Sequence, residues 1–265
     1  MQTNLMIHCG GYRALREEVR SIGTPAPTAT WCPIPHHTLI RQIEESLERS
    51  DLRIVSEAHA LAADGDRYFG LFQVANGHSP AEDYAWVLGL RNSHDQTFPA
   101  GLVVGSQVFV CDNLAFSGEI RIARKHTKNI GRDMPELVNV AIGRLSERWH
   151  SQDERIGRYQ ATEIAPCEAH DLVVRALDSR IITATQVPAV LKEWRAPRHP
   201  EFQDRTAWSL FNAVTETLKD TSVWRLPRRT ESLYGLMDGA CGVAAAARGS
   251  LVLPEGIEDA ELLAA

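Results

Sequence analysis

The chain has 265 residues, of which 44% are hydrophobic and 23% are charged, and these proportions are typical of a globular protein with a normal core. Its formal net charge of −6 at pH 7 excludes binding to polyanions through bulk charge, so any nucleic-acid surface has to be a local patch. No apolar run of about 18 residues occurs, and we therefore expect no membrane span.

The number and spacing of the five cysteines indicate the cell compartment in which the protein works. They are odd in number and form no C-x-x-C pair, which argues against a zinc ribbon and against a disulfide framework. The N-terminus lacks the basic start and apolar core of a signal peptide, so we expect a cytoplasmic protein. P-loop, dinucleotide-binding and zinc-protease motifs are absent as well, and the sequence predicts neither a cofactor nor a bound metal.

Residues 1–35 are expected to form an N-terminal arm. A short helix is predicted for residues 12–22, and four prolines between positions 25 and 35 then favour an extended segment, because each proline fixes its own φ and restricts the residue before it. Trp31 is the expected anchor of this segment, packed either on the domain or on a neighbouring subunit.

Residues 36–160 are predicted to form an α+β core. It begins with an amphipathic helix over residues 36–50, in which apolar side chains recur at a spacing of four. A β-hairpin is expected over residues 52–75, because Asp64-Gly65 between two apolar runs is typical of a type I′ turn.

That turn sets a register, which pairs Leu61 with Tyr68 and Val55 with Val74. Large apolar side chains on both faces of the hairpin predict that it is covered on both sides. Short connections lead to further strands, so we expect a largely antiparallel sheet over residues 52–124. These strands are predicted near residues 84–91, 102–111 and 118–123.

The hydrophobic period then changes from two to 3.5 residues, which predicts one long helix near residues 134–160 with Asp133 as its N-cap. The apolar seam of this helix packs either in the core or between subunits, and the pattern alone leaves both arrangements open. The seam residues are Val138, Ile142, Leu145, Trp149, Gln152, Ile156 and Tyr159.

Residues 161–248 are predicted to be a helical C-terminal part, which belongs to the same domain or forms a subdomain of it. Helices are expected near residues 167–177, 188–194, 206–219 and 230–237. Residues 249–265 contain four acids and no base, and we expect them to be a flexible acidic tail.

Five polar side chains follow one another at the exit of the strand near residues 84–91: Arg91, Asn92, Ser93, His94 and Asp95. One interpretation is a catalytic or metal site in which His94 and Asp95 act with Asp112 or His126. The other is a turn network, in which Asp and Ser side chains bond their own backbone. Ser93 and His94 cannot act on each other, because neighbours in an extended chain point to opposite faces.

A second polar corner, Cys111-Asp112-Asn113, ends the strand near residues 102–111. A reactive Cys111 would need a base nearby that lowers the pKa of its thiol. If the two strands pair as a hairpin, this corner lies at the far end from Arg91–Asp95, so a pocket shared within one subunit is not implied.

The most basic stretch of the chain comes next. It holds five cations and no acid between positions 121 and 132, namely Arg121, Arg124, Lys125, Lys128 and Arg132. Such a cluster can neutralise phosphates and bind single-stranded DNA in a salt-sensitive way. The alternative is a solvated loop in front of the long helix.

The segment that contains these motifs resembles the DUF932 family of phage- and plasmid-associated proteins, through Arg91–Asp95, Val110–Asn113 and Gly118–His126. Gln96 stands where many members have Gly, and Asp112 where many have Ser or Thr. The resemblance covers roughly residues 25–240. It implies an association with DNA-processing genes, and strand-annealing proteins also combine an antiparallel sheet with a long helix.

Three functions are therefore expected, in this order. The first is non-catalytic binding or annealing of single-stranded DNA by a homo-oligomer, in recombination or on a mobile element. The second is a metal-dependent or hydrolytic enzyme that uses His94 and Asp95. The third is a phage or plasmid protein that modulates a host factor.

Overall fold

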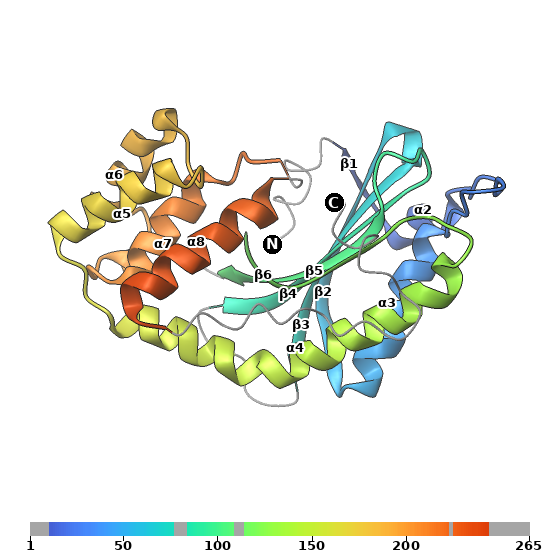
Figure 1. Ribbon diagram of the computed structural model, residues 1–265, viewed down its shortest axis with the longest axis horizontal. Helices are drawn as coiled ribbons and strands as arrows, with labels where there is room; N and C mark the ends of the chain where they lie inside the picture. The colour runs from blue at the N-terminus through green and yellow to red at the C-terminus, as the bar shows by residue number, and fades with distance from the viewer. Residues whose placement is uncertain (1–10, 77–83, 109–113, 223–224, 244–265) are drawn as a thin grey trace.

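The computed structural model describes residues 11–76, 84–108, 114–222 and 225–243, and it shows an α+β fold (Figure 1). The sheet has six strands in the order of the chain, and every neighbouring pair is antiparallel, which confirms the predicted fold class. The strands are β1 (Tyr12–Ala14), β2 (Leu52–Ala62), β3 (Arg67–Asn76), β4 (Tyr84–Ser93), β5 (Ala100–Val108) and β6 (Leu114–Arg124).

The helices lie at two sides of the sheet and along one of its faces. They are α2 (Arg16–Ser21), α3 (His36–Arg49), α4 (Ile130–Ala161), α5 (Pro166–Asp178), α6 (Val187–Arg195), α7 (Ala207–Thr217) and α8 (Leu226–Cys241). Figure 1 shows α2 and α3 on one side, α5 to α8 on the other, and α4 running between the two groups. None of the helices in these residues is long and apolar enough to cross a membrane.

The N-terminal arm contributes a strand to the sheet. Tyr12 pairs with Leu61 and Ala14 with His59, whereas the sequence had predicted one helix over residues 12–22. Only the second half of that segment is helical, as α2. The outer edge of β2 has backbone groups that need partners, and the arm supplies them at this end of the strand.

The β2–β3 hairpin has the predicted register near its turn but not beyond a β-bulge. Leu61 pairs with Tyr68 as expected, whereas Val74 pairs with Ile54 and not with Val55. Val55 is the inserted residue and is 47% exposed, so the hairpin is not covered on both sides here. A bulge moves every residue beyond it to the other face, and an alternating pattern does not reveal where that happens.

The turn of this hairpin has the backbone conformation that was predicted. Asp64 and Gly65 have φ values of 54° and 95°, both in the left-handed region that a type I′ turn requires. Ala63 also has a positive φ, 51°, so the left-handed stretch is one residue longer than in a two-residue turn.

The two faces of the sheet carry different side chains. Leu90, Leu102 and Ile122 are cross-strand neighbours on one face, here named the helix-covered face. Side chains of three helices form hydrogen bonds with side chains on this face: His36 of α3 with Asn92, Asp133 of α4 with Arg124, and Tyr234 of α8 with Ser106. The other face, here named the second face, carries the residues whose positions alternate with these, including Arg91 and Arg121.

Helix α4 begins at Ile130 with Asn129 as its N-cap, so the predicted cap was wrong. Asp133 lies within the first turn, is fully buried, and binds arginine side chains instead of free backbone amides. The described seam residues are buried, so the seam packs in the core: Val138, Ile142, Leu145, Gln152, Ile156 and Tyr159. The side chain of Trp149 lies outside the described part of the chain.

A buried polar network attaches α8 to α4 and to the sheet. Arg155 Nη2 donates to Asp238 Oδ2 at 3.0 Å, and the Tyr159 hydroxyl donates to Asp238 Oδ1 at 2.6 Å. Burial raises the pKa of Tyr159, so its hydroxyl keeps the proton that it donates. The Tyr234 hydroxyl is bonded to Ser106 on β5 at 2.9 Å, and the helical C-terminal part is thereby fixed to the sheet.

Candidate nucleic-acid interface

Asn92 is the centre of the polar corner at the end of β4. Its side chain is fully buried, and its amide nitrogen donates to the backbone oxygen of Ile34 and to His36 Nδ1, both at 2.9 Å. Its amide oxygen accepts a hydrogen bond of 2.8 Å from His126 Nε2. One side chain therefore joins the proline-rich arm, helix α3, strand β4 and the turn after β6.

His94 stacks on His36 in the same corner. The ring centroids are 3.9 Å apart and the planes differ by 8°. His94 Nε2 donates to the Ile34 oxygen at 3.0 Å, and since His36 Nδ1 accepts from Asn92, the other nitrogen of His36 donates to the Gly65 oxygen at 2.9 Å. Both rings thus serve to hold neighbouring backbone in place.

Two histidines of this corner are held neutral. Burial and the neighbouring His94 lower the pKa of His36 to about 3. Burial and His94 likewise lower the pKa of His126 to about 4. Protonation of His36 would charge a ring that stacks on His94 and accepts a hydrogen bond from Asn92, and protonation of His126 would place a charge in a buried site.

Ser93 and Asp95 stabilise the loop between β4 and β5. Ser93 Oγ donates to the Phe98 oxygen at 2.8 Å, and Asp95 accepts hydrogen bonds from Arg67 Nε at 2.6 Å and from the Thr97 amide at 3.1 Å. Burial alone raises the pKa of Asp95, but the bonds from Thr97 and Arg67 outweigh it and lower the pKa. These contacts are the turn network that the sequence offered as one of its two interpretations.

Within the described residues, the geometry does not bring together the side chains of His94 and Asp95, on which the enzyme interpretation depends. His94 points into the arm and Asp95 to Arg67, so the two side chains diverge. Within the described ranges, no three His, Cys, Asp or Glu side chains lie where they could hold a metal ion. Cys111, Asp112 and Asn113, which form the second polar corner, lie outside the described residues.

The basic segment is divided between the two faces of the sheet. Arg121 is paired with Val103 on the second face and is exposed. Arg124, three residues later, lies on the helix-covered face and is buried. Its Nε and Nη2 atoms donate to Asp133 Oδ2 at 2.9 and 2.6 Å, so Arg124 holds the start of α4 and is withdrawn from the predicted phosphate-binding set.

The remaining cations of the segment face the solvent. Lys125 and Lys128 are exposed in the turn after β6, and the side chain of Arg132 is 61% exposed on the first turn of α4. Arg132 also reaches Asp133 at 2.7 Å. We name Arg121, Lys125, Lys128 and Arg132 together the cationic surface.

Arg91, the first residue of the polar corner, extends the cationic surface on the second face. It is paired with Gly101 on β5, where a Cβ atom would lie 3.2 Å from Arg91 Nε, so its side chain crosses β5 towards β6. Burial and the charge of Arg121 lower the pKa of Arg91 to about 10. Two positive groups, one on β4 and one on β6, thus lie on the same face of the sheet with β5 between them.

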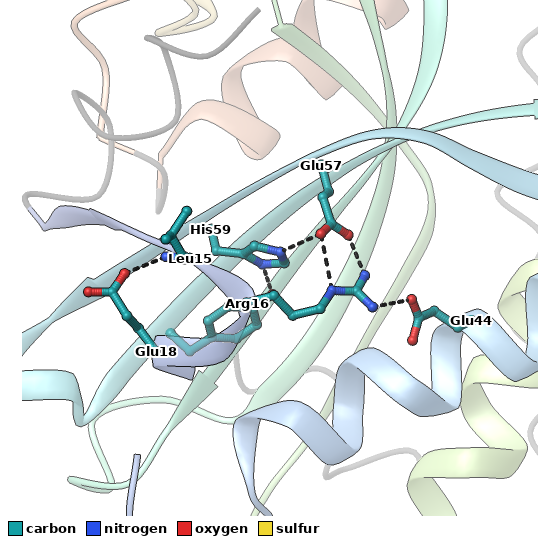
Figure 2. Close-up of polar contacts among 7 residues, drawn as sticks. Leu15, Arg16, Glu18, Glu44, Glu57 and His59 are labelled. Atoms are coloured by element: carbon teal, nitrogen blue, oxygen red, sulfur yellow. Dashed lines mark hydrogen bonds and ion pairs between the residues drawn. The ribbon is translucent and has the colours of Figure 1, made fainter. Parts of the chain in front are cut away.

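A second polar chain, which sequence reasoning missed, fixes α2 and α3 to β2 (Figure 2). Arg16 donates to Glu44 at 2.6 Å and to both oxygens of Glu57, and Glu57 lies 3.3 Å from His59 Nε2. His59 Nδ1 is 2.9 Å from the Tyr68 hydroxyl, so His59 is a hydrogen-bonded core histidine.

The proton positions in this chain follow from burial. Burial raises the pKa of the Tyr68 hydroxyl and lowers that of His59. Tyr68 therefore remains a donor to a neutral His59, and its hydroxyl is sealed in the core. This row of polar contacts positions helices α2 and α3, and it does not activate a nucleophile. Arg16 and Glu57 lie 41 residues apart, so no local pattern could have linked them.

A family model matches most of the chain. The chain matches the family described as "Domain of unknown function (DUF932)" over residues 26–234, which contains the end of the arm, the polar corner, the basic segment and α4. No curated protein and no solved structure matches it significantly.

Proposed function

Because the chain belongs to the DUF932 family, whose description assigns no activity, we propose from the site itself that the protein binds single-stranded DNA without catalysis. The binding element is the cationic surface, which contacts phosphate groups of the DNA backbone. A role in strand annealing, recombination or a mobile element is an extension of this proposal that rests on the sequence resemblance.

The observation that carries the proposal is the isolation of positive charge. Arg121, Lys125 and Lys128 are exposed, and within the described residues none of them has a carboxylate partner. The acid that follows the segment, Asp133, is buried and bound by Arg124. In a chain of net charge −6, the exposed cations therefore create a local positive potential, which attracts phosphate groups.

The polar corner supports binding over catalysis. Asn92, Ser93 and His94 are buried, and their side chains donate hydrogen bonds to backbone oxygens of the protein. Such a corner keeps the turn between β6 and α4 in one conformation, because His126 is bonded to Asn92 and Arg124 to Asp133 on either side of Lys125. A fixed turn loses less conformational entropy when its lysines bind phosphate.

The expected homo-oligomer stays a prediction. The described residues of the α4 seam that raised it are buried within one chain, so they offer no surface to a partner. Light scattering with and without DNA measures the oligomeric state directly. The expected role in modulating a host factor likewise stays a prediction, and co-purification tests it.

Fluorescence anisotropy with labelled oligo(dT) across a salt series tests the proposal. The logarithm of the binding constant should fall with the logarithm of salt concentration by about 0.7 per phosphate neutralised. Replacing Arg121, Lys125 and Lys128 by Gln should weaken binding and reduce that slope by about 2. The control replaces Arg20, Arg175 and Arg228, which are exposed elsewhere, and changes the net charge equally. No binding at low salt, or equal losses in both triple variants, contradicts the proposal.

A further inference from the structure

Trp31 lies where the proline-rich arm meets the cationic surface. The arm makes a tight turn there, since the Thr28 amide donates to the Trp31 oxygen at 2.8 Å and the Trp31 amide to Thr28 Oγ1 at 3.1 Å. The next amide, that of Cys32, donates to the His126 oxygen at 2.7 Å. This bond ties the arm to the turn that carries Lys125 and Lys128.

The indole of Trp31 lies beside that turn and is partly exposed, although its Nε1 atom is buried and has no hydrogen-bond partner among the described residues. Its ring centroid is 6.4 Å from that of His126, with a tilt of 54° between the planes. His126 is itself buried and bonded to Asn92, so it forms a rigid support under the indole. Residues 23–30, which precede Trp31 in the arm, are all exposed.

This exposure sets Trp31 apart from the other tryptophans whose side chains are described. Trp86, Trp194 and Trp208 are all buried in the core. The indole of Trp31 is partly exposed, one residue from a backbone bond to the His126 turn, so part of its ring is available to a partner. The exposed lysines on either side of His126 restrict that partner to one that combines a flat apolar face with negative charge.

We propose that Trp31 is the base-stacking residue of the cationic surface. Its indole stacks on an unpaired nucleobase while Lys125 and Lys128 bind the phosphates beside that base. The inference rests on the proposed function and adds a preference to it. Bases of a duplex are already stacked on each other, whereas every unpaired base offers a free face, so the surface selects single strands.

The test compares wild-type protein with W31L, W31F and the double variant K125Q/K128Q, on oligo(dT) and on its duplex with oligo(dA). Leu keeps apolar bulk for packing but has no aromatic face, whereas Phe keeps a face. W31L should bind oligo(dT) about five- to a hundredfold more weakly and bind the duplex nearly as the wild type does. W31F should retain most of the affinity. K125Q/K128Q should lower the salt slope, which W31L should leave unchanged.

The outcomes separate the two proposals. If the wild-type protein binds neither oligo(dT) nor duplex at low salt, the proposed function and the role of Trp31 both fail. If it binds DNA in a salt-dependent way and W31L binds oligo(dT) as tightly as the wild type, only the role of Trp31 fails, and the residue is an anchor of the arm. Thermal melting of each variant verifies that the affinities refer to folded protein.

Discussion

The side-chain oxygen of Asn92 accepts a hydrogen bond of 2.8 Å from His126 Nε2, across 34 positions of the chain. This bond joins the polar corner of β4 to the basic turn after β6, the two features that the sequence shows as separate motifs. Because Asn92 also bonds the arm and α3, its side chain is where the parts of the family region meet.

Replacing Asn92 with Ala should destabilise the protein by roughly 2–4 kcal/mol, because His36, His126 and the Ile34 oxygen all lose a buried partner. Urea unfolding measures the change. Asn139, exposed on α4, is the matched control, and its replacement with Ala should cost less than about 0.5 kcal/mol. Equal costs at both positions would contradict the central role of Asn92.

Stability should fall in mild acid. The folded pKa values of His36 and His126, about 3 and about 4, lie below the ordinary 6.5. At pH values between the folded pKa values and 6.5, the unfolded chain therefore binds more protons than the folded chain does. The contribution is complete above pH 6.5 and is lost as pH falls towards the folded values. Between pH 6.5 and 5, ordinary carboxylates remain ionised in both states, so histidines dominate this window.

Urea midpoints at pH 5, 6, 7 and 8 check this dependence. His126→Gln can still donate to Asn92 but does not titrate, and it should flatten the slope by up to about 1.4 kcal/mol per pH unit. His170→Gln, at an exposed position of α5, serves as the control and should leave the slope unchanged. An unaltered slope in His126→Gln would show that this ring is not buried neutral.

Gln96→Gly should stabilise the protein. Gln96 has a φ of 61°, in the left-handed region that glycine adopts without a steric penalty, and the resemblance places Gly at this position in many relatives. We expect a gain of about 0.5–1 kcal/mol in the free energy of unfolding. The same substitution at the exposed Gln203, where φ is −68°, should destabilise instead. A loss at Gln96 would be inconsistent with the strained backbone seen there.

Arg124→Gln and Lys125→Gln should differ in stability although they are neighbours in the basic segment. Arg124→Gln removes two hydrogen bonds from the buried Asp133 and should cost roughly 2–4 kcal/mol, since Arg132 still holds the other oxygen. Lys125→Gln should cost less than about 0.5 kcal/mol. The double variant Arg124→Gln/Asp133→Asn should cost less than the sum of its parts, because the two residues are coupled. Additive costs would exclude that coupling.

Much of the fold could be predicted because its cause is local. The alternation in β2 to β6 and the 3.5-residue period of α4 are repeated patterns of burial, and they are visible wherever one face of an element meets the core. The turn at Asp64-Gly65 was predictable as well, since its left-handed backbone restricts the residues that fit. The bulge at Val55 was not, because one inserted residue leaves the local composition unchanged.

The candidate site was predicted as a set of residues and not as an arrangement. The sequence by itself determined the α+β class, the order of strands and helices, and the presence of a basic segment, because these depend on residue types and on spacing. Only the tertiary structure decided that Arg124 turns inward to Asp133 while Arg121 stays outside, and that Trp31 lies beside His126. The physical reason is that burial and ion pairing are made by partners distant in sequence, such as Asn92 and His126, which no local pattern encodes.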